Sequence, residues 1–291
     1  MTETRALPLA DRPVRSSGYA SILMHAEAGP SASHRAEVAA GLARDFKAHL
    51  IGLGAEAVEA AYMADPYSSL MTAEWIIAAQ DQVAARLREA EETFRRDAAG
   101  VDLEWRAMQA FPNAALVEVS RAADLIVVGA VASGASNYRT ANAAEVVMGS
   151  GRPVLVVPES GRHLRAANII IAWKDTREAR RAVADAMPFL LRAENVVVQA
   201  VCTADDGVES AAFQADDVVA ALRRHGVAAR PGVTTARDED VVKELYRIAG
   251  LNEADLIVAG AYGHSRLAEW AFGGVTNDLL HRPEHFVLTS H

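Results

Sequence analysis

Short runs of apolar residues alternate along the chain with longer segments whose apolar positions recur at helical spacing. In the first half this alternation predicts strands and helices in turn. The strands are predicted at Ser21–His25, His49–Leu53, Val101–Met108, Leu125–Gly129 and Pro153–Val157, and the helices at Ala36–Phe46, Leu70–Ala98 and from an Asn113 cap to Val119. The segment Ala55–Ser69 contains Pro66 and breaks the pattern, so it is predicted to be irregular.

The second half repeats the same order of elements. Its strands are predicted at Asn168–Ala172, Asn195–Val201, Ala228–Thr234, Leu256–Ala259 and Phe286–Thr289, and its helices at Arg177–Leu191, Ala211–His225, from Asp238 or Asp240 to Ala249, and at Val275–Leu280. Thr176 is a candidate cap for the first of these helices, because its hydroxyl can accept a hydrogen bond from a free amide of the first turn.

An internal repeat shows that the two halves are related. Residues Ala123–Ala130 read ADLIVVGA and residues Ala254–Ala261 read ADLIVAGA, so seven of eight positions match across 131 residues. A period of this length is the size of a domain. We therefore predict an α/β fold with a flexible tail at residues 1–18, a first domain at 19–158 and a second at 168–291. Alternating strands and helices favour mostly parallel sheets covered on both faces.

Four glycines follow the fourth strand of the second half. Gly260 and Gly263 are three residues apart, and Gly273 and Gly274 directly precede the short helix predicted at Val275–Leu280. Glycine allows close approach of the backbone, and the amides at a helix N-terminus are free to bind anions. The pattern indicates a phosphate-binding loop at the carboxyl end of a parallel sheet, where ligands bind in such folds. The alternative is that these glycines serve turns of the fold alone.

The spacing G-x2-G-x9-G in a domain of this size resembles the universal stress protein family. Ala172–Leu190 (AWKDTREARRAVADAMPFL) resembles the first strand and helix of such domains, and His281–His291 resembles their last strand. The resemblance covers both halves and implies two tandem five-stranded, Rossmann-like sheets. It also implies that the two domains pack as an internal pseudo-two-fold pair through their last strands, Pro153–Val157 and Phe286–Thr289.

By the same resemblance, the second half binds ATP or another adenine nucleotide, with or without Mg²⁺. The phosphates would rest on the amides of Gly263, Gly273, Gly274 and Val275, with Gly260 allowing close approach and Thr276 donating its hydroxyl. ATP-binding members carry Ser or Thr directly after the last glycine of the motif, where this chain has Gly274. Arg266 is a candidate phosphate ligand, although it could equally pair with Glu269.

The first half keeps one of the four glycines. Alignment on the repeat places Gly129 opposite Gly260, whereas Ala132, Ala141 and Asn142 stand opposite the other three. A Cβ atom at those positions would crowd a phosphate. The first half is therefore predicted not to bind nucleotide in the manner of the family and to be structural.

The two halves also differ at the end of their first strands. The family carries an acidic residue there, near the adenosine. Glu27 holds this place in the first half, and Lys174 holds it in the second, followed by Asp175. Lys174 could face a phosphate or carboxylate, or it could be a solvated lysine beside Asp175. Trp173 could close an adenine pocket or pack in the core.

The composition limits the classes of partner and the location that the protein can be expected to have. The net charge is −9, from 38 acidic against 29 basic residues, which disfavours a nucleic-acid backbone as partner. The single Cys202 cannot form an internal disulfide, which favours a cytoplasmic protein. No apolar run reaches the length needed to cross a bilayer, and the first eighteen residues lack the apolar core of a signal peptide.

These observations favour a tandem universal stress protein that acts as a nucleotide-occupied sensor and meets protein partners in stress signalling. The alternatives are a scaffold protein that binds no nucleotide and, ranked last, a weak ATP hydrolase or nucleotidyl-transfer enzyme. No P-loop, zinc-protease motif, paired cysteines or nucleophile elbow is present, and no acid–base pair is identifiable. We therefore do not expect an enzyme. The sequence leaves open whether two tandem chains form a homodimer.

Overall fold

The structure is a computed structural model of the 291-residue chain. It describes residues 18–29, 31–59, 73–131, 135–159, 163–203, 207–261, 279–280 and 283–291. These residues form one ten-stranded sheet in the order β3-β2-β1-β4-β5-β10-β9-β6-β7-β8. The strands are β1 (Ser21–Ala26), β2 (His49–Ala55), β3 (Leu103–Met108), β4 (Leu125–Gly129), β5 (Val154–Val157), β6 (Asn168–Trp173), β7 (Asn195–Cys202), β8 (Ala229–Thr235), β9 (Leu256–Gly260) and β10 (Phe286–Ser290).

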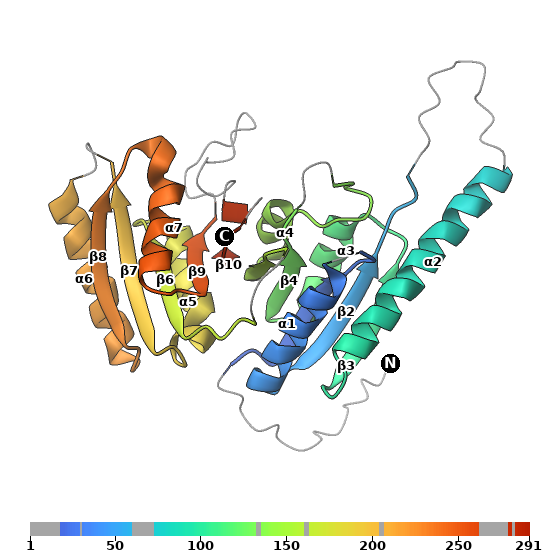
Figure 1. Cartoon of the computed structure of the whole chain (residues 1–291), viewed down its shortest axis with the longest axis horizontal. Coiled ribbons are helices and arrows are strands. Elements are labelled where there is room, and N and C mark those ends of the chain that lie inside the picture. Colours follow the sequence, from blue (N-terminus) through green and yellow to red (C-terminus); the bar gives the residue numbers. More distant parts are fainter. Residues whose placement is uncertain are drawn as a thin grey trace, which may run out of the picture.

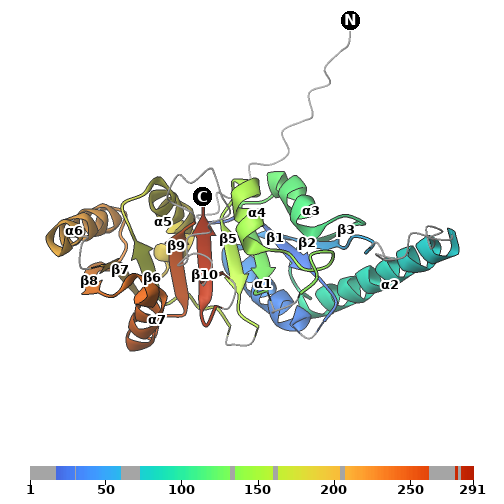
Figure 2. The same cartoon turned by 90° about the horizontal axis from the view of Figure 1, so that it is seen from above.

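The sheet runs through the whole molecule, with β5 and β10 side by side at its middle (Figures 1 and 2). All neighbouring strands are parallel except β5 and β10, which are antiparallel and pair Val154 with Thr289 and Val156 with Val287. From either edge to the middle, the sheet contains the third, second, first, fourth and fifth strands of one half, in that order. The predicted pairing of the two last strands is therefore confirmed, and it joins two five-stranded sheets into one.

Helices cover both faces of the sheet. They are α1 (Ala32–Phe46), α2 (Ala73–Asp97), α3 (Pro112–Val119), α4 (Ala143–Ser150), α5 (Arg177–Leu190), α6 (Val208–Arg224) and α7 (Val241–Leu251), with 3-10 turns at Ser120–Ala122 and Asp238–Asp240. One hydrophobic cluster includes side chains of α1, α2, α5 and α6, while α3 and α4 pack on the opposite face. β4 and β5 are buried almost throughout, as expected for strands covered on both sides.

An aromatic cluster that the sequence reading missed links the two halves on the α1–α5 face. The rings of Tyr19, Phe46 and Phe189 meet edge to face, with centroids 5.2–5.5 Å apart. The Tyr19 hydroxyl donates to the backbone oxygen of Asp185, and Arg192 stacks over the Phe46 ring. Burial raises the pKa of the Tyr19 hydroxyl, so this donor stays protonated.

The predicted cap of α3 is wrong, whereas the predicted start of α7 at Asp240 is confirmed. Asn113 is not the cap of α3, because it lies inside the helix, where its side chain accepts a hydrogen bond from the Asn142 amide and donates one to Glu145. Asp240 holds the N-cap position of α7 but makes no capping hydrogen bond, since its carboxylate pairs with Arg237 and Lys243. For Asn113, partners in and beside α4 outcompete the local amides.

Other predictions agree with the described residues. The Thr176 hydroxyl accepts a hydrogen bond from the Ala179 amide and caps α5 as predicted. Helix α1 begins at Ala32, four residues before the predicted start. The side chain of Cys202 is buried. No helix in the described part of the chain combines the length and apolarity that a membrane crossing requires.

Candidate functional site

Two of the predicted ligand-binding residues, Gly260 and Lys174, fall among the described residues. Gly260 ends β9, and Lys174 directly follows β6, the strand beside it. The other six lie outside the described residues: Gly263, Arg266, Gly273, Gly274, Val275 and Thr276. The structure therefore describes one rim of the predicted site, formed by the carboxyl ends of β6 and β9 and the start of α5.

Gly260 lies directly against the first turn of α5. A Cβ atom built on this glycine would stand 2.5 Å from the amide nitrogen of Ala179 and 2.6 Å from the carbonyl carbon of Glu178. Both distances are shorter than van der Waals contact, and both atoms belong to backbone. Gly260 is thus required for close packing of a helix on a strand end, a role that glycine also has in dinucleotide-binding folds.

Lys174 is exposed at the tip of β6. This exposure agrees with the alternative of a solvated lysine, and the neighbouring Asp175 pairs with Arg180 at 2.6 Å. No acidic side chain of the described residues lies within ion-pair distance of Lys174. Its ammonium group is therefore directed into solvent at the rim, where a bound anion could approach it.

Trp173 is buried and belongs to the core cluster on the α5 face. Its ring nitrogen finds no acceptor among the described residues, although buried indole N–H groups ordinarily have one. Two further buried polar atoms nearby have no described hydrogen-bond partner, the Glu178 Oε2 atom and the Ser290 hydroxyl. Ser290 pairs with Gly260 in the sheet. Residues next to the end of β9 thus contribute three buried polar atoms without a described hydrogen-bond partner, although the other Glu178 oxygen accepts from Arg177.

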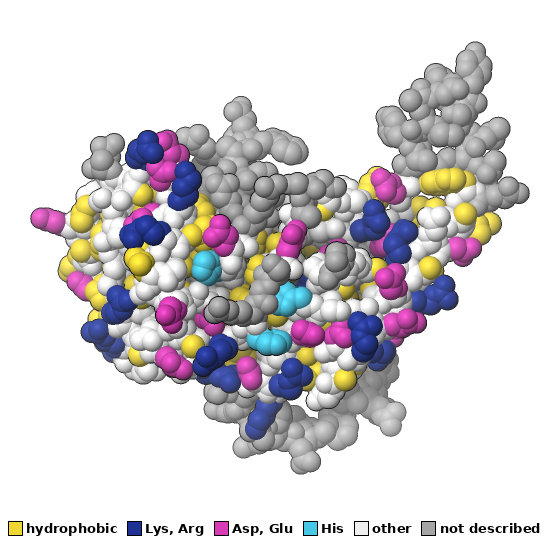
Figure 3. Space-filling view, in the orientation of Figure 1, with side chains coloured by type: hydrophobic (Ala, Val, Ile, Leu, Met, Phe, Trp, Pro, Cys, Tyr) yellow, Lys and Arg dark blue, Asp and Glu magenta, His cyan; other side chains and the backbone are white. Residues whose placement is uncertain are grey.

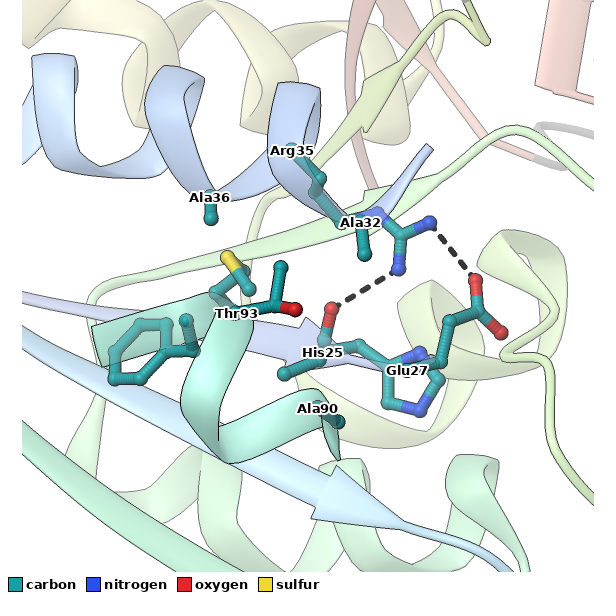
Figure 4. Close-up of a pocket in the computed structure, with 10 residues that line it drawn as sticks. His25, Glu27, Ala32, Arg35, Ala36, Ala90 and Thr93 are labelled. Atoms are coloured by element: carbon teal, nitrogen blue, oxygen red, sulfur yellow. Dashed lines mark hydrogen bonds and ion pairs between the residues drawn. The ribbon is translucent and has the colours of Figure 1, made fainter. Parts of the chain in front are cut away.

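The matching position in the first half is filled by the protein itself. Arg35, on α1, donates from Nη2 to the Glu27 carboxylate at 2.8 Å and from Nη1 to the His25 backbone oxygen at 3.1 Å (Figure 4). The second Glu27 oxygen accepts from the Thr140 hydroxyl at 3.0 Å. A Cβ atom on Gly129 would meet the Arg35 guanidinium, with Cζ 2.8 Å away.

This ion pair is buried and leaves no free space. The side chain of Arg35 is 2% exposed and that of Glu27 19%, and the pocket they line has no room even for a water-sized molecule. Burial alone would raise the pKa of the Glu27 carboxyl, but the Arg35 guanidinium outweighs it, so this pKa lies below its ordinary value. Glu27 is therefore ionised and engaged. The structural role of the first half stays a prediction.

Sequence reasoning missed Arg35. The available signal was a single arginine within the small apolar positions that α1 presents to the sheet, next to Ala36 and Ala39. A buried arginine requires an anionic partner, and Glu27 at the nearby strand end is the acidic residue within reach. Among the described residues, no cluster of three or more His, Cys, Asp or Glu side chains is arranged to hold a metal ion.

No family model matches this chain, and no curated protein matches it in sequence. Solved structures do match it in fold. A universal stress protein from Archaeoglobus fulgidus aligns over 93% of this chain and 95% of its own, with a TM-score of 0.65 and 13% identity. A functionally unknown protein from Pseudomonas aeruginosa aligns over 93% and 92%, with a TM-score of 0.57 and 17% identity.

The chain has the fold of the universal stress proteins. The alignment with the Archaeoglobus fulgidus universal stress protein spans nearly the full length of both chains, so it covers both five-stranded halves and their junction. A candidate universal stress protein from Pseudomonas aeruginosa gives the same coverage as the other Pseudomonas protein, with a TM-score of 0.56 and 18% identity. At these identities the similarity establishes the fold, and the ligand must be argued from the residues of this chain.

Proposed function

We propose that this protein is a tandem universal stress protein that acts in the stress response and binds an adenine nucleotide in its second half. The fold supports membership of this family, and the two domains are assigned to residues 19–158 and 168–291. The observation that carries the proposal is an asymmetry between the halves. Arg35 fills the first-half position, while the second half keeps four glycines and has three buried polar atoms next to the end of β9 that lack a hydrogen-bond partner among the described residues.

The roles of the second-half residues follow from this asymmetry. The amides of Gly263, Gly273, Gly274 and Val275 would hold phosphate oxygens, assisted by the Thr276 hydroxyl and the Arg266 guanidinium. Lys174 would approach the ligand from the end of β6. Gly260 contributes by keeping α5 tight against β9, so its effect on the ligand is indirect. The protein would act as a ligand-occupied sensor, with Mg²⁺ bound through the phosphates if at all, and without an efficient catalytic activity.

Native mass spectrometry of freshly purified protein tests the proposal first, by the mass of any ligand carried through purification. Isothermal titration calorimetry with ATP, ADP and AMP then compares wild type with the double variant Gly263→Val and Gly273→Val. We expect one nucleotide per wild-type chain and loss of binding in the variant. Ala132→Val, at the first-half position aligned with Gly263, is the matched control and should bind as wild type. Undiminished nucleotide affinity in the double variant would falsify the assignment.

A scaffold that binds no nucleotide is the second candidate. Two observations favour it: an exposed lysine, Lys174, replaces the acidic residue that the resemblance leads us to expect, and Gly274 replaces the hydroxyl residue after Gly273. This candidate predicts an empty chain after purification and no change of melting temperature with millimolar ATP, ADP or AMP. Steady nucleotide hydrolysis that the glycine double variant abolishes would instead indicate an ATP hydrolase.

A further inference from the structure

Strand β3 ends the ten-stranded sheet on the side of the first half and has no described neighbour beyond it. Its backbone groups alternate in direction. The Asp102 and Met108 oxygens accept hydrogen bonds from amides at the two ends of β2, so the even-numbered residues of β3 face β2. The N–H and C=O groups of Leu103, Trp105 and Ala107 therefore face outward, because neighbouring residues in a strand point to opposite sides. This edge can pair with another strand.

The equivalent edge of the second half, β8, is protected. Here the even-numbered residues face β7, since the Ala228 oxygen accepts from the Val196 amide and the Ala236 amide donates to the Cys202 oxygen. Pro231 consequently falls at an outward-facing position, where its missing N–H interrupts any added ladder. β3 contains no proline between Leu103 and Met108. Of the two outer edges, β3 is the one open to strand addition.

Helix α2 also leaves part of the sheet surface beside this edge uncovered. Helix α6 packs on β7 and β8, whereas its counterpart α2 packs mainly on α1, β2 and β1. The shift leaves an open groove of about 250 Å³ along β3, lined by Ala84, Leu87, Arg88, Glu91, Trp105 and Ala107, with Gln109 at its end. Trp105 is half-buried in this groove. Its inner face lies on Gly54, where a Cβ atom would stand 2.7 Å from the indole ring.

Helix α2 also reaches beyond the sheet at the β3 end in both views (Figures 1 and 2). Its first turns carry two large exposed apolar side chains, Ile76 and Ile77, which are 38% and 56% exposed. Apolar side chains gather on this outer end of the helix (Figure 3). An apolar helix surface that projects past an open strand edge is suited to contact a molecule docked on that edge.

We propose that β3 is a homodimer interface, in which β3 of a second copy adds antiparallel, centred on Trp105, and extends the sheet across two chains. In this register the two Trp105 residues form a hydrogen-bonded pair, and Leu103 of each copy faces Ala107 of the other. Glu104 of each copy then stands opposite Arg106 of the other. These are non-hydrogen-bonded pairs, whose side chains lie closest, so opposite charges meet twice.

The charges of Glu104 and Arg106 favour this register over the registers shifted by one residue. An antiparallel pairing centred on Glu104 would oppose two carboxylates, and one centred on Arg106 would oppose two guanidinium groups, each of which is destabilising. Within one chain Arg106 already donates to Glu104 at 2.6 Å, so both side chains lie on one face, opposite the groove. The two Trp105 side chains would lie on the groove face, each packed on its own Gly54 and Phe94. This inference is independent of the nucleotide site.

Sedimentation velocity of the full chain over a range of micromolar concentrations tests the proposal. We expect the wild type to dimerise. Glu104→Arg opposes like charges across the interface and should raise the dimer dissociation constant at least about tenfold. The exchange Glu104→Arg with Arg106→Glu restores both opposite-charge pairs and should recover the dimer. A wild type that remains monomeric at every concentration, or a dimer that Glu104→Arg leaves unchanged, overturns the proposal.

A second pair of variants separates edge pairing from loss of folding. Ala107→Pro removes one outward-facing amide of β3 and leaves the ladder with β2 intact, so the chain should stay folded by circular dichroism and become monomeric. Val233→Pro is the matched control, since Val233 holds the same outward-facing orientation on β8, and it should leave the dimer unchanged. A dimer lost with Val233→Pro and kept with Ala107→Pro would place the interface on β8 and contradict the inference.

Discussion

The two glycines that end β4 and β9 occupy matching positions, yet the structure predicts different costs for a methyl group at each. In Gly260→Ala the new Cβ would lie 2.5 Å from the Ala179 amide nitrogen. That atom is held by the Thr176 cap at 3.2 Å and by the rest of α5. The helix must therefore move away from β9, because backbone cannot rotate aside as the end of a side chain can.

The magnitude follows from two losses. Overpacking of a well-packed site costs about 1–3 kcal/mol, and weakening the Thr176 cap adds about 1 kcal/mol. Replacing glycine lowers the entropy of the unfolded chain and offsets about 0.5 kcal/mol. We expect Gly260→Ala to lower the free energy of unfolding by about 1.5–3.5 kcal/mol.

In Gly129→Ala the new Cβ atom would contact a side chain and not the backbone. Its Cβ would press on the Arg35 guanidinium, with Nε 2.9 Å away, and would displace it from Glu27 at a cost of about 1–2 kcal/mol. In an Arg35→Ala background that obstacle is gone, so the added methyl group should cost nothing or fill part of the cavity. The two substitutions are therefore non-additive, as expected for residues in contact.

Urea unfolding followed by circular dichroism measures all four free energies of the cycle and that of Gly260→Ala. The packing argument is refuted if Gly260→Ala unfolds at the same urea concentration as wild type. It is also refuted if Gly129→Ala costs as much in the Arg35→Ala background as in wild type.

Two further predictions concern stability. Burial lowers the pKa of His25 to about 4, so between that pH and the ordinary pKa of 6.5 the unfolded chain binds a proton that the folded chain does not. The free energy of unfolding should therefore fall by about 3 kcal/mol as the pH drops from 6.5 to 4. In His25→Asn, the urea midpoint should change less with pH over this range. Phe189→Ala should cost about 3–5 kcal/mol in urea unfolding by emptying the junction of the halves, whereas Phe213→Ala, at a side chain 69% exposed, should leave the midpoint unchanged.

The sequence alone predicted all ten described strands in order and the described helices except α4, Ala143–Ser150. A short apolar run such as Leu125–Gly129 indicates a buried strand, because every side chain of a strand covered on both faces lies in the core. The internal repeat also predicted that the halves are equivalent, and the resemblance predicted the β5–β10 junction that the structure confirms. The error at Asn113 arose because its side chain bonds to Asn142 and Glu145 and not to a local amide.

The candidate site was predicted less completely. Glycine spacing identified Gly260, but its contact with the backbone of α5 depends on how closely that helix docks on β9. The glycine at Gly129 looked like a remnant of a binding loop, and only the fold shows the Arg35 guanidinium against it. A pattern of residue types carries no information on the distance between a helix start and a strand end.

Local and periodic features could therefore be predicted from the sequence: the strands and helices, the burial of the strands, and the repetition of the two halves. The tertiary structure alone decided which groups meet across the chain, such as Arg35 with Glu27, and which surfaces stay open, such as the groove left beside Trp105 by the position of α2. The physical reason is that helix docking depends on the combined shape of many side chains. Shifts of a few ångströms in that docking decide whether a site is filled or free.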